Sequence, residues 1–84
     1  MKASNLREYA KSQGWKKTQT PNGPEKWIDN NNIPRITIKK GSGRAPGSEY
    51  PHVEIKDSTG QRIDTFGNPV TRKSKGNHTP VIDD

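Results

Sequence analysis

The two histidines are the residues of this chain best suited to acid–base chemistry. With no cysteine present, His52 and His78 carry the only side chains that ordinarily titrate near neutral pH. Neither has a partner at the spacing of a metal-binding motif. The nine carboxylates are scattered along the chain, which disfavours a site of several converging oxygen ligands. The sequence therefore predicts neither a metal site nor a cofactor.

RNA is a substrate that such residues could cleave without a metal. Its 2′-OH can attack the adjacent phosphate, so a ribonuclease needs a base, an acid and cations for the phosphate charge. His78 is the first candidate for acid–base work and His52 is the second. The candidates to hold the phosphate are Lys39, Arg44, Lys56, Arg62 and Arg72.

The charge balance also favours a polyanionic partner. Lysine and arginine number 15 against 9 acidic residues, a net charge of +6 at pH 7. No segment combines a basic face with a broad apolar face, and no apolar run is long enough for a membrane span. Charge alone leaves three function classes open: a ribonuclease, a non-catalytic nucleic-acid-binding module, and a small protein-binding inhibitor or adaptor.

Several of these residues also have simpler interpretations. A lone histidine on a small domain is more often an ordinary surface residue than a catalyst. Asp64 could balance basic neighbours across a hairpin. Trp15 and Trp27 could stack on bases, but a chain with so few apolar residues needs both tryptophans in its core.

Composition limits the chain to one small domain, residues 1–84. Hydrophobic residues make up 24% of it, and only 12 residues are Ile, Val, Leu or Phe. That share is low enough to raise the possibility of disorder and excludes a large core or a deep cofactor pocket. Neither disulfides nor thiolate-bound metals can compensate, because there is no cysteine.

The N-terminal segment has the pattern of a short helix over residues 5–13. Asn5 and Glu8 have the spacing of a capping box, and Leu6, Tyr9 and Ala10 form one apolar stripe. Gly14 is placed to end the helix.

Beyond Gly14 the apolar residues alternate, which predicts strands at about 15–20, 25–29, 34–40, 52–57 and 61–66. Asp57 to Gln61 suits a turn with a left-handed Gly60, a register that pairs Ile55 with Ile63 and Lys56 with Arg62. Residues 41–47 form a glycine-rich loop. Residues 67–84 are irregular, with a short closing strand within 78–82 and a frayed end at Asp83 and Asp84.

The fold class predicted from these elements is α+β, with a short N-terminal helix packed on a twisted antiparallel sheet of about four strands. The apolar residues fall on one face of the sheet and one stripe of the helix. The core predicted on this basis is Leu6, Tyr9, Trp15, Trp27, Ile36, Ile38, Val53, Ile55, Ile63 and Val81.

Two stretches in the second half resemble a known family. One is Tyr50-Pro51-His52-Val53-Glu54-Ile55. The other is Asp64-x-x-Gly67-Asn68-Pro69-Val70-x-Arg72-x-Ser74-x-x-x-His78-x-Pro80. Together they resemble the C-terminal toxin domains of bacterial polymorphic toxins, which end Rhs-repeat, contact-dependent-inhibition and type VII-secreted effectors. The resemblance covers most of residues 14–82.

Many such domains are metal-independent ribonucleases of the barnase/EndoU/colicin/RelE group. The resemblance therefore implies an RNA-cleaving toxin that is neutralised by a cognate immunity protein. The expected substrate is tRNA or rRNA, and the expected state of the protein is a monomer. The resemblance also implies an effector delivered into the target-cell cytoplasm, or a cytoplasmic protein if the chain stands alone. It points to Asp64, Arg72, His78 and Thr79 as site residues. A weaker similarity, to HicA-type mRNA interferases, implies the same class of function.

Overall fold

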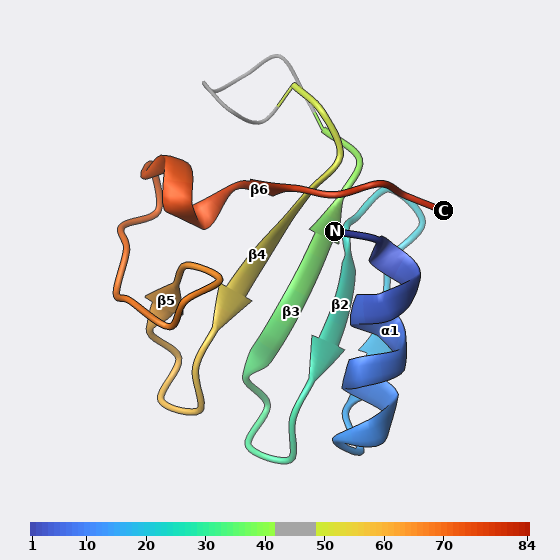
Figure 1. Ribbon diagram of the computed structural model, residues 1–84. Helices are drawn as coiled ribbons and strands as arrows, with labels where there is room; N and C mark the ends of the chain where they lie inside the picture. The colour runs from blue at the N-terminus through green and yellow to red at the C-terminus, as the bar shows by residue number, and fades with distance from the viewer. Residues whose placement is uncertain (42–48) are drawn as a thin grey trace.

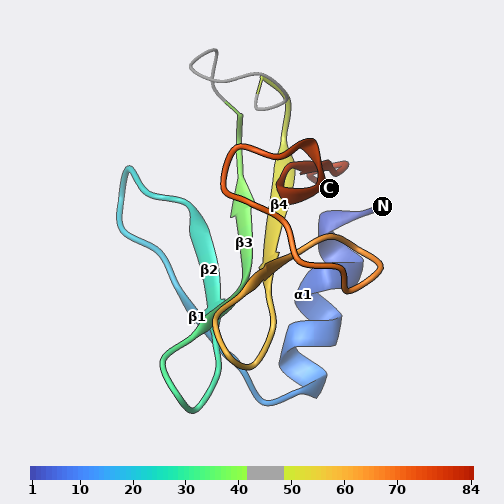
Figure 2. The ribbon, with the colours of Figure 1, turned by 90° about the vertical axis from the view of Figure 1, so that its left-hand side faces the viewer.

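A computed structural model describes residues 1–41 and 49–84 and shows one helix lying against one face of an antiparallel sheet (Figures 1 and 2). The helix is α1 (Ala3–Ser12). The strands are β1 (Lys16–Thr18), β2 (Glu25–Ile28), β3 (Pro34–Lys39), β4 (His52–Lys56), β5 (Arg62–Ile63) and β6 (Thr79–Pro80), and a 3₁₀ turn, η1 (Lys75–Asn77), precedes β6. The predicted α+β class is confirmed, and the described residues form a sheet of six strands instead of about four. Apart from Gly41, the predicted loop at 41–47 lies outside the described residues.

Strands β1 to β5 follow one another in order across the sheet, and β6 pairs with the beginning of β4. The predicted hairpin register is confirmed, since Ile55 lies opposite Ile63. The Asp57 carboxylate accepts hydrogen bonds from the backbone amides of Thr59 and Gln61, and Gly60 has a φ of 90°. Gly60 therefore occupies the left-handed position that this turn requires, as the local pattern predicts.

The two faces of the sheet have different compositions because side chains alternate along each strand. The face toward α1 belongs to the apolar core, which consists of Ala3, Ala10, Trp27, Ile36, Ile38, Val53 and Val81, with Leu6, Trp15 and Ile55 packed against it. Tyr9 is 53% exposed, so its placement in the core was wrong. The Tyr9 ring instead meets Trp15 edge-on, with 5.7 Å between the ring centroids.

The start of the helix differs from the prediction. Helix α1 begins at Ala3, and its N-cap residue, Lys2, makes no side-chain capping bond. The Asp84 carboxylate takes that role from the other end of the chain, accepting hydrogen bonds from the Ser4 amide at 2.9 Å and the Ser4 hydroxyl at 2.6 Å. A carboxylate at this position also interacts favourably with the helix dipole. The capping box and the frayed C-terminus were therefore both wrong.

Arg7 connects the helix to both the sheet and the C-terminus. Its Nε lies 2.9 Å from Oε2 of Glu25 on β2, and its Nη2 lies 3.0 Å from Oδ1 of Asp83. The Trp27 indole N–H donates to the same Glu25 carboxylate at 2.7 Å. Burial raises the pKa of Glu25, but the hydrogen bonds from Arg7 and Trp27 outweigh burial and hold the pKa below its usual value.

These carboxylates predict a loss of stability in acid. The pKa values of Glu25 and Asp84 are depressed in the folded state, that of Asp84 mainly by its hydrogen bonds from Ser4. As the pH falls, the unfolded chain therefore binds protons first, and the stabilisation present above about pH 5 is lost through roughly pH 4 and below. Urea unfolding at pH 7, 4 and 3 should show a falling midpoint, with a smaller fall in Asp84→Asn. A midpoint independent of pH would contradict this.

Strand lengths also differ from the prediction. Strand β1 is shorter than residues 15–20, and β5 ends at Ile63 instead of continuing to residue 66. The second difference arises because Asp64 starts a turn, in which its carboxylate accepts hydrogen bonds from the amides of Phe66 and Asn68, each at 2.9 Å. Among the residues described, no helix is long and apolar enough to cross a membrane.

Candidate active site

The polar face of the sheet, opposite α1, brings together charged residues from three strands. Strand alternation places His52, Glu54 and Lys56 of β4 on this face. Lys39 of β3 lies opposite His52, and Arg62 of β5 lies opposite Lys56. The antiparallel register therefore surrounds one glutamate with basic side chains.

Glu54 is the centre of this group. Its side chain is 8% exposed, with Oε2 at 2.6 Å from the Lys39 ammonium and Oε1 at 2.7 Å from Nη1 of Arg62. Burial raises the pKa of Glu54, but the hydrogen bonds from Lys39 and Arg62 outweigh burial and lower the pKa below its usual value. The carboxylate is therefore ionised at neutral pH, in the form that can accept a proton or bind a cation.

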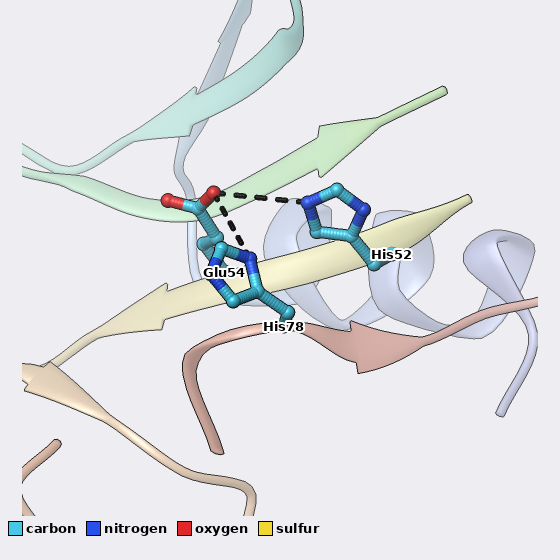
Figure 3. A group of neighbouring side chains, drawn as sticks. All are labelled: His52, Glu54 and His78. Carbon is cyan, nitrogen blue, oxygen red and sulfur yellow. Dashed lines mark ion pairs between the residues drawn. The ribbon is translucent and has the colours of Figure 1, made fainter. Parts of the chain in front are cut away.

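Both histidines face the same oxygen of Glu54. Nε2 of His52 and Nδ1 of His78 each lie 3.8 Å from Oε2, as Figure 3 shows. His78 reaches this position because it lies between η1 and β6, and β6 pairs with the beginning of β4. The two rings meet edge to face, with centroids 5.1 Å apart. Residues far apart in the sequence therefore form one cluster, His52–Glu54–His78.

The outer nitrogen of each ring is bound to a backbone carbonyl. Nδ1 of His52 lies 2.9 Å from the Tyr50 carbonyl oxygen, and Nε2 of His78 lies 3.1 Å from that of Arg72. A carbonyl only accepts, so these nitrogens carry the hydrogen. In a neutral ring the inner nitrogen is then a bare lone pair, and both inner nitrogens are buried without a hydrogen-bond partner.

A shallow groove opens beside Glu54. It has a volume of about 140 Å³ and is lined by Pro24, Lys26, Pro34, Thr37, Lys39, Glu54, Lys56 and Arg62. Four of these residues are lysine or arginine, and Glu54 is the one carboxylate. The groove therefore presents a cationic surface with an ionised acceptor at its wall, and the two imidazoles face that acceptor without lining the groove.

Most of the residues singled out in the sequence lie in or beside this group: His52, His78, Lys39, Lys56 and Arg62. Glu54, which all of them surround, was not among the predicted site residues. The signal that could have identified it is its position in His52-x-Glu54-x-Lys56, which puts all three side chains on one face of a strand.

The other predicted residues have different surroundings. The Asp64 carboxylate is bound to the amides of its own turn. The carbonyl of Arg72, and not its side chain, contacts His78 and the Asn77 amide group. Thr79 pairs with Val53 in the β6–β4 ladder. Arg44 lies outside the described residues.

Neither of two sequence comparisons identifies a relative. No protein-family model matches the chain, and no curated protein matches it. Inferences about function therefore depend on the geometry of this site and on the resemblance in the sequence.

Proposed function

We propose that this protein is a metal-independent endoribonuclease that uses the RNA 2′-OH as its nucleophile. The observation that carries the proposal is the ionised Glu54 carboxylate in the wall of a cationic groove, paired with Lys39 and Arg62 and backed by two imidazoles. These are the base, the phosphate-binding cations and the acid that cleavage by the 2′-OH needs.

Each residue then has a defined role. Glu54 takes the proton from the 2′-OH as that oxygen bonds to phosphorus. The bond from phosphorus to the 5′ oxygen breaks, and His78, in its imidazolium form with both ring nitrogens protonated, gives the proton of its inner nitrogen to the leaving oxygen. His78 is chosen because its side chain is 10% exposed and that of His52 is 3% exposed. Lys39 and Arg62 neutralise the charge on the phosphate oxygens. The products are a 2′,3′-cyclic phosphate and a 5′-OH.

Substrate binding would also strengthen the base. Lys39 and Arg62 lower the pKa of Glu54 mainly by donating hydrogen bonds to its carboxylate and also by their positive charge. A phosphate in the groove competes for both donors, and burial then raises the pKa of Glu54 toward the range of an effective base. The same two side chains thus hold the carboxylate ionised in the free protein and activate it in the complex.

The resemblance to polymorphic toxin domains adds a biological role to the proposal. On that basis the substrate is tRNA or rRNA in the cytoplasm of a target cell, and a cognate immunity protein blocks the enzyme. Of the residues that the resemblance indicates, His78 lies in the cluster, and Arg72 holds the His78 ring through its carbonyl.

The proposal is tested by incubating the purified protein with total tRNA and rRNA in the presence of EDTA. We expect discrete fragments that end in cyclic phosphate. RNA that stays intact at micromolar protein would overturn the proposal.

A second candidate is a nucleic-acid-binding module without catalysis. It is favoured by the burial of the inner nitrogens of His52 and His78, which keeps both from the solvent. This alternative predicts RNA binding that weakens steeply with salt and leaves the RNA uncut.

A further inference from the structure

We infer that His52, Glu54 and His78 form a binding site for one divalent transition-metal ion such as Zn²⁺. Two imidazole nitrogens and one carboxylate oxygen are a ligand set found in zinc proteins, and it leaves a coordination position open. Each of the three residues offers one ligand atom, and these three atoms all lie within 4.8 Å of one another.

The orientation of the rings is the first argument. The carbonyls of Tyr50 and Arg72 hold the outer nitrogens at 2.9 Å and 3.1 Å, so the neutral rings turn unprotonated nitrogens toward Glu54. A backbone carbonyl on the far nitrogen is the arrangement that fixes the tautomer of metal-binding histidines. Here both rings have it.

The second argument is that the inner nitrogens of both rings are buried without hydrogen-bond partners. The side chains of His52 and His78 are 3% and 10% exposed, and their inner nitrogens have no hydrogen-bond partner. Two buried lone pairs that face a carboxylate oxygen repel it, which costs free energy. A cation placed between the three atoms converts this repulsion into coordination.

Binding would require the three ligand atoms to move closer together. Each inner nitrogen lies 3.8 Å from Oε2 of Glu54. Around a tetrahedral Zn²⁺ with bonds of about 2.0–2.1 Å, ligand atoms are roughly 3.3–3.4 Å apart. The two nitrogen–oxygen pairs would each have to come about half an ångström closer, and the two nitrogens, which lie within 4.8 Å of each other, up to about 1.4 Å closer.

Lys39 is the competitor for this site, since its ammonium lies 2.6 Å from the same Oε2. Its side chain is 40% exposed and can leave for the solvent when a metal arrives. Arg62 can remain on Oε1. Removing the Lys39 charge should therefore strengthen metal binding, although the same residue is proposed to hold the RNA phosphate.

The test is titration of the whole chain with Zn²⁺ in the absence of RNA, followed by competition with a chromogenic chelator. Co²⁺ is the spectroscopic probe, because imidazole ligands change its visible absorption. We expect one ion per chain. His52→Gln, checked for folding by circular dichroism, should bind at least about 10–100-fold more weakly, because loss of a ligand costs no less than loss of an outer-shell partner.

Lys39→Met keeps the test decisive if the buried His52 variant fails to fold. It should bind Zn²⁺ more tightly than wild type, whereas Lys11→Met, which removes the same charge from α1, should bind as wild type does. No stoichiometric Zn²⁺ binding, weaker binding by Lys39→Met, or a folded His52→Gln that binds as wild type does would each overturn the inference. Binding is measured without RNA, so its result is independent of whether the protein cleaves RNA.

Discussion

Replacing Glu54 with glutamine should reduce the rate of RNA cleavage by about 10²–10⁴-fold, the usual contribution of a positioned general base. Glutamine keeps the shape of the side chain, and its one amide oxygen can still accept a hydrogen bond from Lys39 or Arg62, but it cannot take the 2′-OH proton. Single-turnover cleavage of a labelled RNA in EDTA measures the effect.

The control for this variant is Glu8→Gln, which makes the same change on the exposed side of α1 and should cleave at the wild-type rate. RNA binding by Glu54→Gln, measured by fluorescence anisotropy, should be kept or strengthened, because the groove loses its one negative charge. A folded Glu54→Gln that cleaves within a few-fold of wild type would show that another group is the base.

The second large effect that we expect is a loss of folding stability. Trp27→Ala should cost about 3–5 kcal/mol of unfolding free energy, the usual cost of truncating a buried aromatic side chain. Trp27 is 4% exposed, and the alanine would also remove the N–H donor that Glu25 accepts at 2.7 Å. A domain of this size has a total stability of about 4–13 kcal/mol, so the variant should lose between about a quarter and all of it.

Phe66→Ala is the matched control, because Phe66 is 88% exposed and its truncation should change the stability by no more than about 0.5 kcal/mol. Urea unfolding followed by circular dichroism measures both variants. If Trp27→Ala and Phe66→Ala lower the unfolding free energy by the same amount, the small core is not what stabilises the chain.

Local sequence patterns were sufficient to predict much of the fold. The strands at 34–40 and 52–57 alternate cleanly, and the turn around Gly60 defines its own register, so the pairing of Ile55 with Ile63 followed from neighbouring residues alone. The helix start could not be predicted in this way, because its cap is Asp84, at the opposite end of the chain. The capping box was inferred from Asn5 and Glu8 alone, and neighbouring residues carry no information about a capping residue so distant in sequence.

The candidate site, like the fold, could be predicted from local sequence only in part. The polar face of β4, with His52 and Lys56, follows from strand alternation. The importance of Glu54 does not, because it depends on the approach of Lys39, Arg62 and His78 from other parts of the chain. For His78 that approach requires β6 to pair with β4, although β5 and η1 lie between these two strands in the sequence.

The central claim is that the 2′-OH of the substrate is the nucleophile, and substrate chemistry tests it most directly. The measurement is cleavage, in EDTA, of an RNA oligonucleotide that spans a mapped cut site, beside the same oligonucleotide with a single 2′-deoxy nucleotide on the 5′ side of that bond. We predict that the RNA is cut to a cyclic phosphate and that the deoxy bond stays intact. Cleavage of the deoxy bond at a comparable rate would contradict the proposed mechanism.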